Sequence, residues 1–313
     1  MRAAPGTDAF YCSDCSREVG EQRFGTSTPA RVVLALEYGG SWPRKALVDN
    51  TLPEQVRDWL QAGVPGLQTR PLLIRQPGRT APPYTLLVAF LDETAPRLYR
   101  FALNDYDECL QLDLAALAAT APVYDTYLMT DPVALVCVNG RRDRACARDG
   151  MPVFHALARQ GGVEAWQSTH LGGHRFAATA LFLPHGLHYG HLLPADAVHV
   201  LEQIRQGGME LAHLRGRMCY PKSAQAAEYY LRTATGQTAP GAYHLESVEA
   251  VGDAAWLVTF SETERGIRHV LHVAADDSVE VIVNSTDTTP EAVPQWRLVQ
   301  HETQAQTGSP QGL

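Results

Sequence analysis

The order of strand and helix patterns recurs along the chain, and this recurrence limits the folds open to it. Short apolar runs predict strands at 31–38, 70–75, 84–91 and 97–103, with helices at 53–62 and 105–119. A similar order of strand, helix, strand, strand and helix follows at 134–138, 152–160, 176–183, 187–192 and 194–206. Alternation of this kind is typical of sheets with helices on their faces. We therefore expect an α/β fold built from a degenerate duplication.

The pattern changes at residue 216, where one helix at 223–235 precedes short alternating strands near 243–251, 255–260, 269–274 and 279–283. The last dozen residues are polar, which is typical of disorder. The sequence thus predicts an N-terminal α/β domain at 1–122, a second α/β domain at 123–215, a small α+β region at 216–300 and a disordered tail at 301–313.

Composition excludes several classes of protein. The 313 residues carry a formal net charge of −8, whereas sequence-independent nucleic-acid binding needs a dense basic surface. No apolar run reaches the roughly 18 residues of a membrane span, and residues 1–10 lack the apolar core of a signal peptide. We expect a soluble, cytoplasmic protein that binds neither nucleic acid nor a membrane.

The number of cysteines is too small for a disulfide-stapled secreted scaffold. A chain of 313 residues has six: Cys12, Cys15, Cys109, Cys137, Cys146 and Cys219. In a reducing cytosol, clustered cysteines more often bind metal or carry out redox chemistry. For Cys12 and Cys15, which have no second pair nearby, we favour a structural or incidental role.

Cys137 and Cys146 form the central motif together with two histidines. Eight residues separate the thiols, and after 23 further residues comes His170-Leu-Gly-Gly-His174. Gly172 and Gly173 permit backbone angles closed to other residues, so a tight loop can present both imidazoles to one point. Thiolates and imidazoles suit zinc and iron–sulfur centres. Zinc sites usually pair cysteines two to four residues apart. The gap of eight residues in this motif favours a loop that surrounds something larger than a single ion.

Further stretches carry a resemblance to a known family. They are 12–16 (CSDCS), 41–47 (SWPRKAL), 72–79 (LLIRQPGR), Tyr189-Gly190 and 214–217 (LRGR). With the motif, they make the chain similar to the sucrase/ferredoxin-like family, whose members contain a thioredoxin-like ferredoxin domain. One branch has two cysteines eight residues apart followed by His-x-Gly-Gly-His. The resemblance implies a [2Fe–2S] cluster held by Cys137, Cys146, His170 and His174, in a thioredoxin-like ferredoxin domain at 123–215.

This ligand set implies a particular redox chemistry. Two ferric ions, two sulfides, two thiolates and two neutral imidazoles sum to zero charge, so the potential should lie above that of an all-cysteine ferredoxin. We expect Cys137 and Cys146 to bind one iron and the two histidines to bind the other. An imidazole ligand also carries a second ring nitrogen, whose proton leaves more readily from the oxidised cluster. Electron transfer coupled to proton transfer is the expectation.

Several residues around the motif have supporting roles in this hypothesis. Gly140 serves a turn, and Arg141, Arg142 and Arg144 form either a basic rim that steers an acidic partner or a solvated loop. Two departures from the family pattern are Ala145, where members often have a second cysteine, and His191, where we expect an arginine.

The sequence favours an electron carrier, or part of a reductase system, over a stand-alone enzyme. No motif indicates the paired carboxylates of a glycosidase, so a sucrase is not expected. No nucleotide-binding fingerprint is present, so the electrons must come from a redox partner protein or a small reductant. The alternative is a zinc-stabilised Cys₂His₂ binding module without a redox role.

Overall fold

The computed structural model describes residues 10–262 and 265–305. Its large sheet contains β1 (Val32–Glu37), β2 (Thr69–Arg75), β3 (Tyr84–Phe90), β4 (Arg97–Leu103), β5 (Val133–Cys137), β6 (Glu164–Ser168), β7 (Ala180–Leu183), β8 (Leu187–Tyr189) and β9 (Leu214–Arg217). These nine strands lie in the order β4-β3-β1-β2-β6-β5-β7-β8-β9. The α helices are α1 (Cys12–Glu18), α2 (Glu54–Ala62), α3 (Leu114–Ala118), α4 (Arg144–Ala158), α5 (Pro194–Arg205) and α6 (Lys222–Thr235), with 3₁₀ turns η1 (Tyr106–Gln111), η2 (Pro122–Tyr127), η3 (His174–Phe176) and η4 (Pro240–Ala242).

The two halves of the large sheet share one topology. In the first, β1 pairs in parallel with β2 and antiparallel with β3, which pairs antiparallel with β4. In the second, β5 pairs in parallel with β6 and antiparallel with β7, which pairs antiparallel with β8. Both halves are thioredoxin-like α/β units, as expected. The strand patterns missed β6, whose sequence EAWQS has no apolar run, and β6 completes the correspondence.

The two units join edge to edge through β2 and β6. These strands pair antiparallel over two positions, Ile74 with Ser168 and Arg75 with Gln167. The two strands overlap only at their carboxyl ends. Ile74 also lies opposite Glu37 at the end of β1, and Ser168 lies opposite Cys137 at the end of β5, so these four residues form one row across the sheet. At the end of β1, buried Glu37 accepts hydrogen bonds of 2.9 and 3.0 Å from Arg79.

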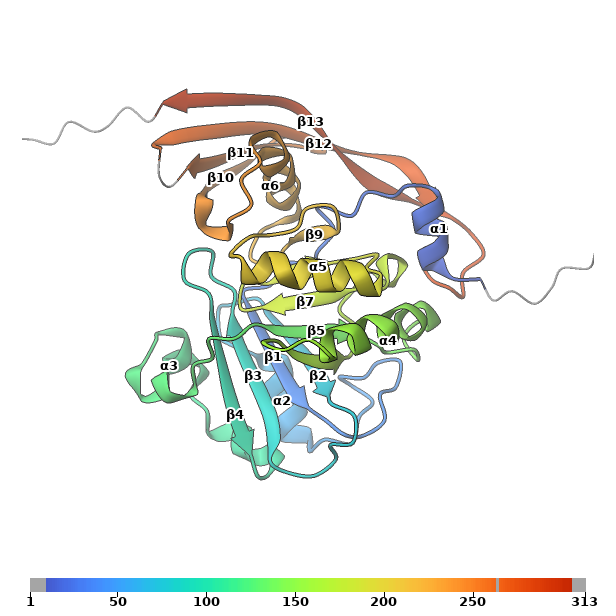
Figure 1. Cartoon of the computed structure of the whole chain (residues 1–313), viewed down its shortest axis with the longest axis vertical. Helices are drawn as coiled ribbons and strands as arrows, with labels where there is room; N and C mark the ends of the chain where they lie inside the picture. Colours follow the sequence, from blue (N-terminus) through green and yellow to red (C-terminus); the bar gives the residue numbers. More distant parts are fainter. Residues whose placement is uncertain (1–9, 263–264, 306–313) are drawn as a thin grey trace, which may run out of the picture.

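Each face of the large sheet is covered by different elements. Side chains from α2, α4 and α5 pack with one face in a single hydrophobic cluster that includes Val56, Phe154 and Val200. The other face packs with α6 and the C-terminal sheet, in a cluster that includes Leu231 and Phe260. Figure 1 shows this second sheet lying across α6 at the top of the molecule. Burial on both faces explains why β5 is apolar throughout and why β1 is apolar except for Glu37 at its end.

Helix α4 begins eight residues before the helix predicted at 152–160. Proline is typical of a first helical position, so the pattern placed the start at Pro152. Instead Asp143 caps the helix by accepting a 2.9 Å hydrogen bond from the backbone N–H of Ala145. Pro152 lies inside the helix, and Cys146 lies in its first turn.

The C-terminal region is more ordered than the sequence predicts. It forms an antiparallel sheet of β10 (Tyr243–Gly252), β11 (Ala255–Glu262), β12 (Ile267–Val281) and β13 (Glu291–Ala305), in that order. The strand expected at 279–283 is mostly the end of β12, and the predicted tail at 301–313 is wrong for 301–305. Those polar residues pair with β12, a long-range contact that composition does not reveal. Residues 306–313 lie outside the described residues.

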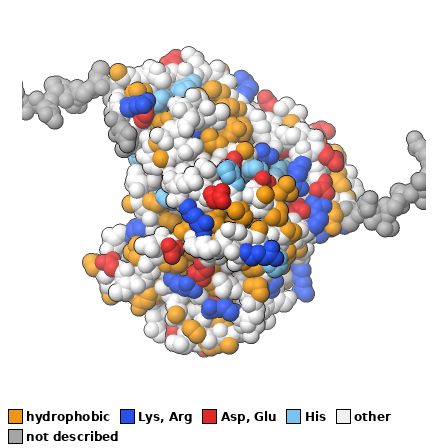
Figure 2. Space-filling view, in the orientation of Figure 1, with side chains coloured by type: hydrophobic (Ala, Val, Ile, Leu, Met, Phe, Trp, Pro, Cys, Tyr) orange, Lys and Arg blue, Asp and Glu red, His pale blue; other side chains and the backbone are white. Residues whose placement is uncertain are grey.

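No helix among the described residues is long and apolar enough to cross a membrane. Figure 2 shows positive and negative side chains interspersed over one face of the molecule.

A buried ion network connects β9 to α6. Oε1 of Glu228 lies 3.3 Å from Arg217 and 2.9 Å from Arg232, and all three side chains are at most 1% exposed. One carboxylate thus partners two guanidinium groups, and carbonyl oxygens satisfy several of their remaining N–H groups.

Glu228→Gln should therefore destabilise the protein strongly, because it leaves two buried cations without a counter-charge. We expect the free energy of unfolding to fall by about 3–5 kcal/mol, measured by denaturant unfolding. Glu202→Gln, on the exposed surface of α5, is the control and should change it by less than about 0.5 kcal/mol. A loss in Glu228→Gln no larger than in the control would contradict the network's role.

Candidate metal centre

The parallel pairing of β5 with β6 places the motif at one edge of the sheet. Cys137 is the last residue of β5 and lies opposite Ser168, the last residue of β6. His170 follows Ser168 by two residues. Carboxyl ends of parallel strands meet at the same edge, where α/β proteins commonly bind ligands. The register therefore brings two residues that lie 33 positions apart to one place.

Helix α4 delivers the second thiol. The chain turns through Gly140 after β5, and Cys146 lies in the first turn of the helix, where the N-terminal dipole favours a thiolate. Gly150, one turn further on, packs against the end of β5. A Cβ atom at Gly150 would lie 2.1 Å from the carbonyl oxygen of Cys137. This glycine, which the sequence reasoning missed, sets the distance between the helix and the strand.

Two glycines shape the histidine loop. Gly172 and Gly173 have φ angles of 97° and 68°, in the left-handed region, as their pattern predicts. A Cβ atom at Gly173 would also lie 2.6 Å from Nη2 of Arg215. Two guanidinium groups hold the loop: Arg70 donates to the carbonyl of His170 at 3.0 Å, and Arg215 donates to that of Gly172 at 2.8 Å.

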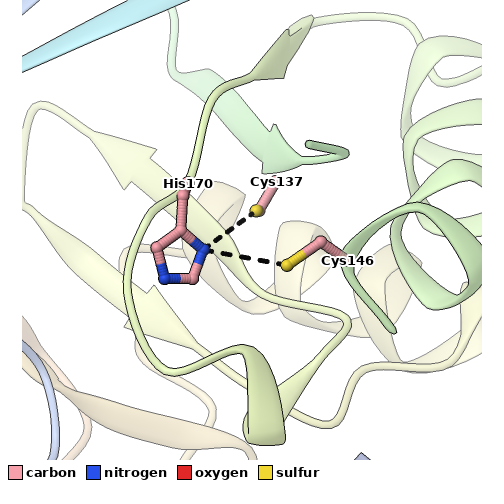
Figure 3. Close-up of side chains that lie close together, drawn as sticks. All are labelled: Cys137, Cys146 and His170. Carbon is pink, nitrogen blue, oxygen red and sulfur yellow. Dashed lines mark hydrogen bonds between the residues drawn. The ribbon is translucent and has the colours of Figure 1, made fainter. Parts of the chain in front are cut away.

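Three of the predicted ligands converge (Figure 3). Nδ1 of His170 lies 3.8 Å from Sγ of Cys137 and 3.7 Å from Sγ of Cys146. One donor atom from each of these residues falls within 4.8 Å of the others. Both cysteines are 1% exposed, whereas His170 is half-buried. The group is therefore closed by protein except beside the imidazole.

His174 lies beside this group, with its ring centroid 5.1 Å from that of His170. It is 6% exposed, and neither ring nitrogen has a hydrogen-bond partner of good geometry among the described residues. Asn284 lies nearby, and Oδ2 of Asp143 is 4.0 Å from Nε2. With Cys12 and Asp143, His174 forms a second group whose donor atoms lie within 4.8 Å of one another. Two unpaired, buried nitrogens are what a metal ligand would present.

Cys12 is connected to this group through Asp143 and Ser285. Ser285 donates a 2.6 Å hydrogen bond to Oδ1 of Asp143, and its hydroxyl accepts one of 3.1 Å from the backbone N–H of Cys12. Burial raises the pKa of the Cys12 thiol to about 12, so it stays protonated at neutral pH. Asp143 could have been identified from its helix-cap position, but nothing local in the sequence marks Ser285.

The pKa values of the site favour binding of a cation. The pKa of Cys137 is held well below its ordinary value, first by a hydrogen bond from Cys146 and second by His170. The same hydrogen bond keeps the pKa of Cys146 well above its ordinary value. One thiol therefore ionises easily and the second requires a cation to replace its proton. Burial, and then the nearby His170, lower the pKa of His174. Its imidazole is thus neutral, with a free lone pair.

The predicted supporting residues differ in what they contact. Gly140 is in the turn, with its N–H donating to the Val138 carbonyl at 2.9 Å. Arg144 donates to the Ser285 carbonyl at 2.8 Å and so fastens the C-terminal sheet to α4. Arg141 is exposed and Arg142 half-buried, at the surface near the site.

His191 contacts the backbone: its Nε2 lies 2.9 Å from the carbonyl oxygen of Arg175. Burial lowers the pKa of His191 to about 3, so its ring is neutral at neutral pH.

The donor set fits a metal ion or an iron–sulfur centre. Two thiols and two imidazoles are soft and borderline ligands that suit zinc and iron. The site also has a positive surround, because Arg215 is buried and none of its hydrogen bonds within the described residues goes to a carboxylate. Burial lowers the pKa of Arg215 to about 9, which leaves it charged at neutral pH.

Fold and site together define a thioredoxin-like α/β protein with cysteine and histidine groups that can hold a metal. The model of the sucrase/ferredoxin-like family matches residues 24–216, more than half of the chain, and the chain belongs to this family. The match includes both thioredoxin-like units and all four predicted ligands. No curated protein shows significant similarity to the chain.

Gly150→Ala tests the contact between α4 and β5. The added methyl group must push the helix away from Cys137, which should lower the free energy of unfolding by about 1–3 kcal/mol and reduce the metal content of the purified protein. Gly161→Ala is the matched control, since a Cβ atom there meets nothing within 4 Å. Unchanged metal content in Gly150→Ala would show that the site does not depend on this contact.

Proposed function

We propose that the chain carries one [2Fe–2S] cluster bound by Cys137, Cys146, His170 and His174, and that it functions in electron transfer. The supporting observation is the convergence of both thiols and His170, with two unpaired buried nitrogens of His174 beside them. Membership of the sucrase/ferredoxin-like family agrees with it. The cluster would supply one-electron chemistry, and the protein's residues determine its charge and access.

The surroundings of the site favour the reduced form of a neutral centre. Adding one electron gives a net negative charge, which the guanidinium groups of Arg70 and Arg215 would stabilise from the far side of the histidine loop. His170 offers the half-buried side of the site, so we propose that electrons enter and leave past its ring.

Metal and sulfide analysis of protein made in cells that assemble clusters tests this proposal. We expect two irons and two sulfides per chain, visible absorption, and an electron paramagnetic resonance signal after dithionite with an average g value like that of Rieske-type centres. His174→Cys should keep the cluster and lower its potential, because the added thiolate makes the core more negative. Cys109→Ser, in the first unit, is the control. Colourless protein with stoichiometric zinc would refute the proposal.

Proton coupling predicts the direction of a pH effect. The oxidised cluster withdraws more electron density from an imidazole ligand, so its ligand proton dissociates at lower pH than in the reduced form. The potential should therefore fall as pH rises between these two pKa values, by about 59 mV per unit if one proton accompanies one electron. Titration of the midpoint potential from pH 6 to pH 9 measures it, and a flat profile would count against coupling.

A zinc-stabilised binding module is the second candidate, and one observation favours it. Zinc bonds of about 2.3 Å to sulfur and 2.0 Å to nitrogen at a tetrahedral angle place the two ligand atoms about 3.5 Å apart. The 3.7 and 3.8 Å separations at His170 are close to this value. The metal analysis above decides between the two functions.

A further inference from the structure

Two adjoining cavities lie between the histidine loop and the C-terminal sheet. The inner one has a volume of about 240 Å³, and its walls include Gly173, Arg175 and Arg215. The outer one has a volume of about 560 Å³ and opens past Trp256. Both are lined by Lys222, Pro294 and Trp296, so these side chains stand between them. Gly173 is the residue of the histidine loop that lines the inner cavity, and none of the four predicted ligands is among its lining residues.

The inner cavity is cationic. Arg175 has one counter-ion, Glu21, at 2.6 Å, whereas Arg215 is 2% exposed and its described hydrogen bonds go to neutral groups. Lys222 is exposed and makes no hydrogen bond or ion pair with any described residue. Three cations with one carboxylate partner leave a net positive charge on this wall, which attracts an anion.

The start of α6 adds to this field. Lys222 is the first residue of this 14-residue helix, and Pro221 at the cap position offers no side-chain hydrogen bond. The first backbone N–H groups of a helix have no partner within it and carry partial positive charge. Lys222 and Ser223, in the first turn of α6, line the outer cavity.

The outer cavity is apolar and aromatic. The rings of Trp256 and Trp296 lie 5.3 Å apart at 52°, and Pro29, Pro221 and Pro294 complete the walls. Flat apolar surfaces of this kind suit a planar ring. Asp276 and Asp277 line the same cavity. They repel an anion, so a bound acid would direct its charged group inward, towards Lys222 and the histidine loop.

We propose that these cavities bind a small aromatic acid, with its ring against Trp256 in the outer cavity and its carboxylate or phosphate group beside Lys222, which lines both cavities. The outer volume lies within the roughly 300–1,000 Å³ of small-molecule sites. Binding itself does not depend on the metal, but identification of this acid as an electron donor or acceptor rests on the proposed function.

Isothermal titration calorimetry of the purified full chain tests the proposal. The probes are 2-naphthoate, 2-naphthyl phosphate and the uncharged 2-naphthamide. We expect saturable binding of at least one acid, at least tenfold tighter than the amide. Lys222→Gln should weaken acid binding about tenfold, the size of one charge-assisted hydrogen bond, and leave the amide unchanged. Trp256→Leu should weaken all three. The acid bound more tightly indicates carboxylate or phosphate recognition.

The chain offers a matched control, because Lys45 is its one other lysine. Lys45 is also exposed, so Lys45→Gln should leave acid binding unchanged. Absence of acid binding, equal binding of acid and amide, or equal effects of the two lysine variants would overturn the proposal. Failure of the two proposals is distinguishable: a coloured protein that binds no acid refutes only the cavity proposal, and a colourless zinc protein that binds the acid refutes only the cluster.

Discussion

The contact between the carbonyl of Cys137 and Gly150 governs the geometry of the candidate metal centre. It holds the first turns of α4 against the end of β5, so that a thiol at the strand end and a thiol at the helix start face one another. The parallel partner β6 then fixes where the histidine loop begins. Because a strand end, a helix start and a loop each contribute donors, their positions depend on backbone packing. Such packing positions ligands more precisely than a flexible loop alone.

Much of the surrounding structure stabilises this arrangement through hydrogen bonds to the backbone. Arg70 and Arg215 donate to carbonyls of the histidine loop, while Asp143 accepts from the start of α4 and from Ser285 in the connection between β12 and β13. Residues from both thioredoxin-like units and from the C-terminal region thus meet around four side chains. Second-layer contacts of this kind orient ligands and tune a metal. The C-terminal region, beyond the family match, is therefore part of the support of the site.

The sequence was sufficient for the α/β class and for the residues that converge, because both depend on local signals. Apolar runs indicated the central strands, and the spacing of cysteines and histidines indicated side chains that lie close together. Prediction from the sequence failed for segments whose secondary structure depends on contacts with distant residues. β6 is five residues without an apolar run, and the polar end of β13 is ordered by pairing with β12. The start of α4 was predicted too late, at Pro152, because proline is typical of the first position of a helix. The approach of Ser285 to Asp143, 142 residues away, has no local signature.

The two units share one topology but differ in the residue at the end of their first strand. At the end of β1, in the position that Cys137 occupies at the end of β5, stands Glu37, buried and paired with Arg79. In the first unit this position is occupied by an ion pair between Glu37 and Arg79. In the second unit it holds the thiol of Cys137, which is available to a ligand. Glu37 lies opposite Ile74, Ile74 lies opposite Ser168, and Ser168 lies opposite Cys137, so the two positions lie at one level of the sheet, with β2 and β6 between them. The large sheet therefore holds, at the same level, one strand end that an ion pair closes and one strand end whose thiol can hold a metal.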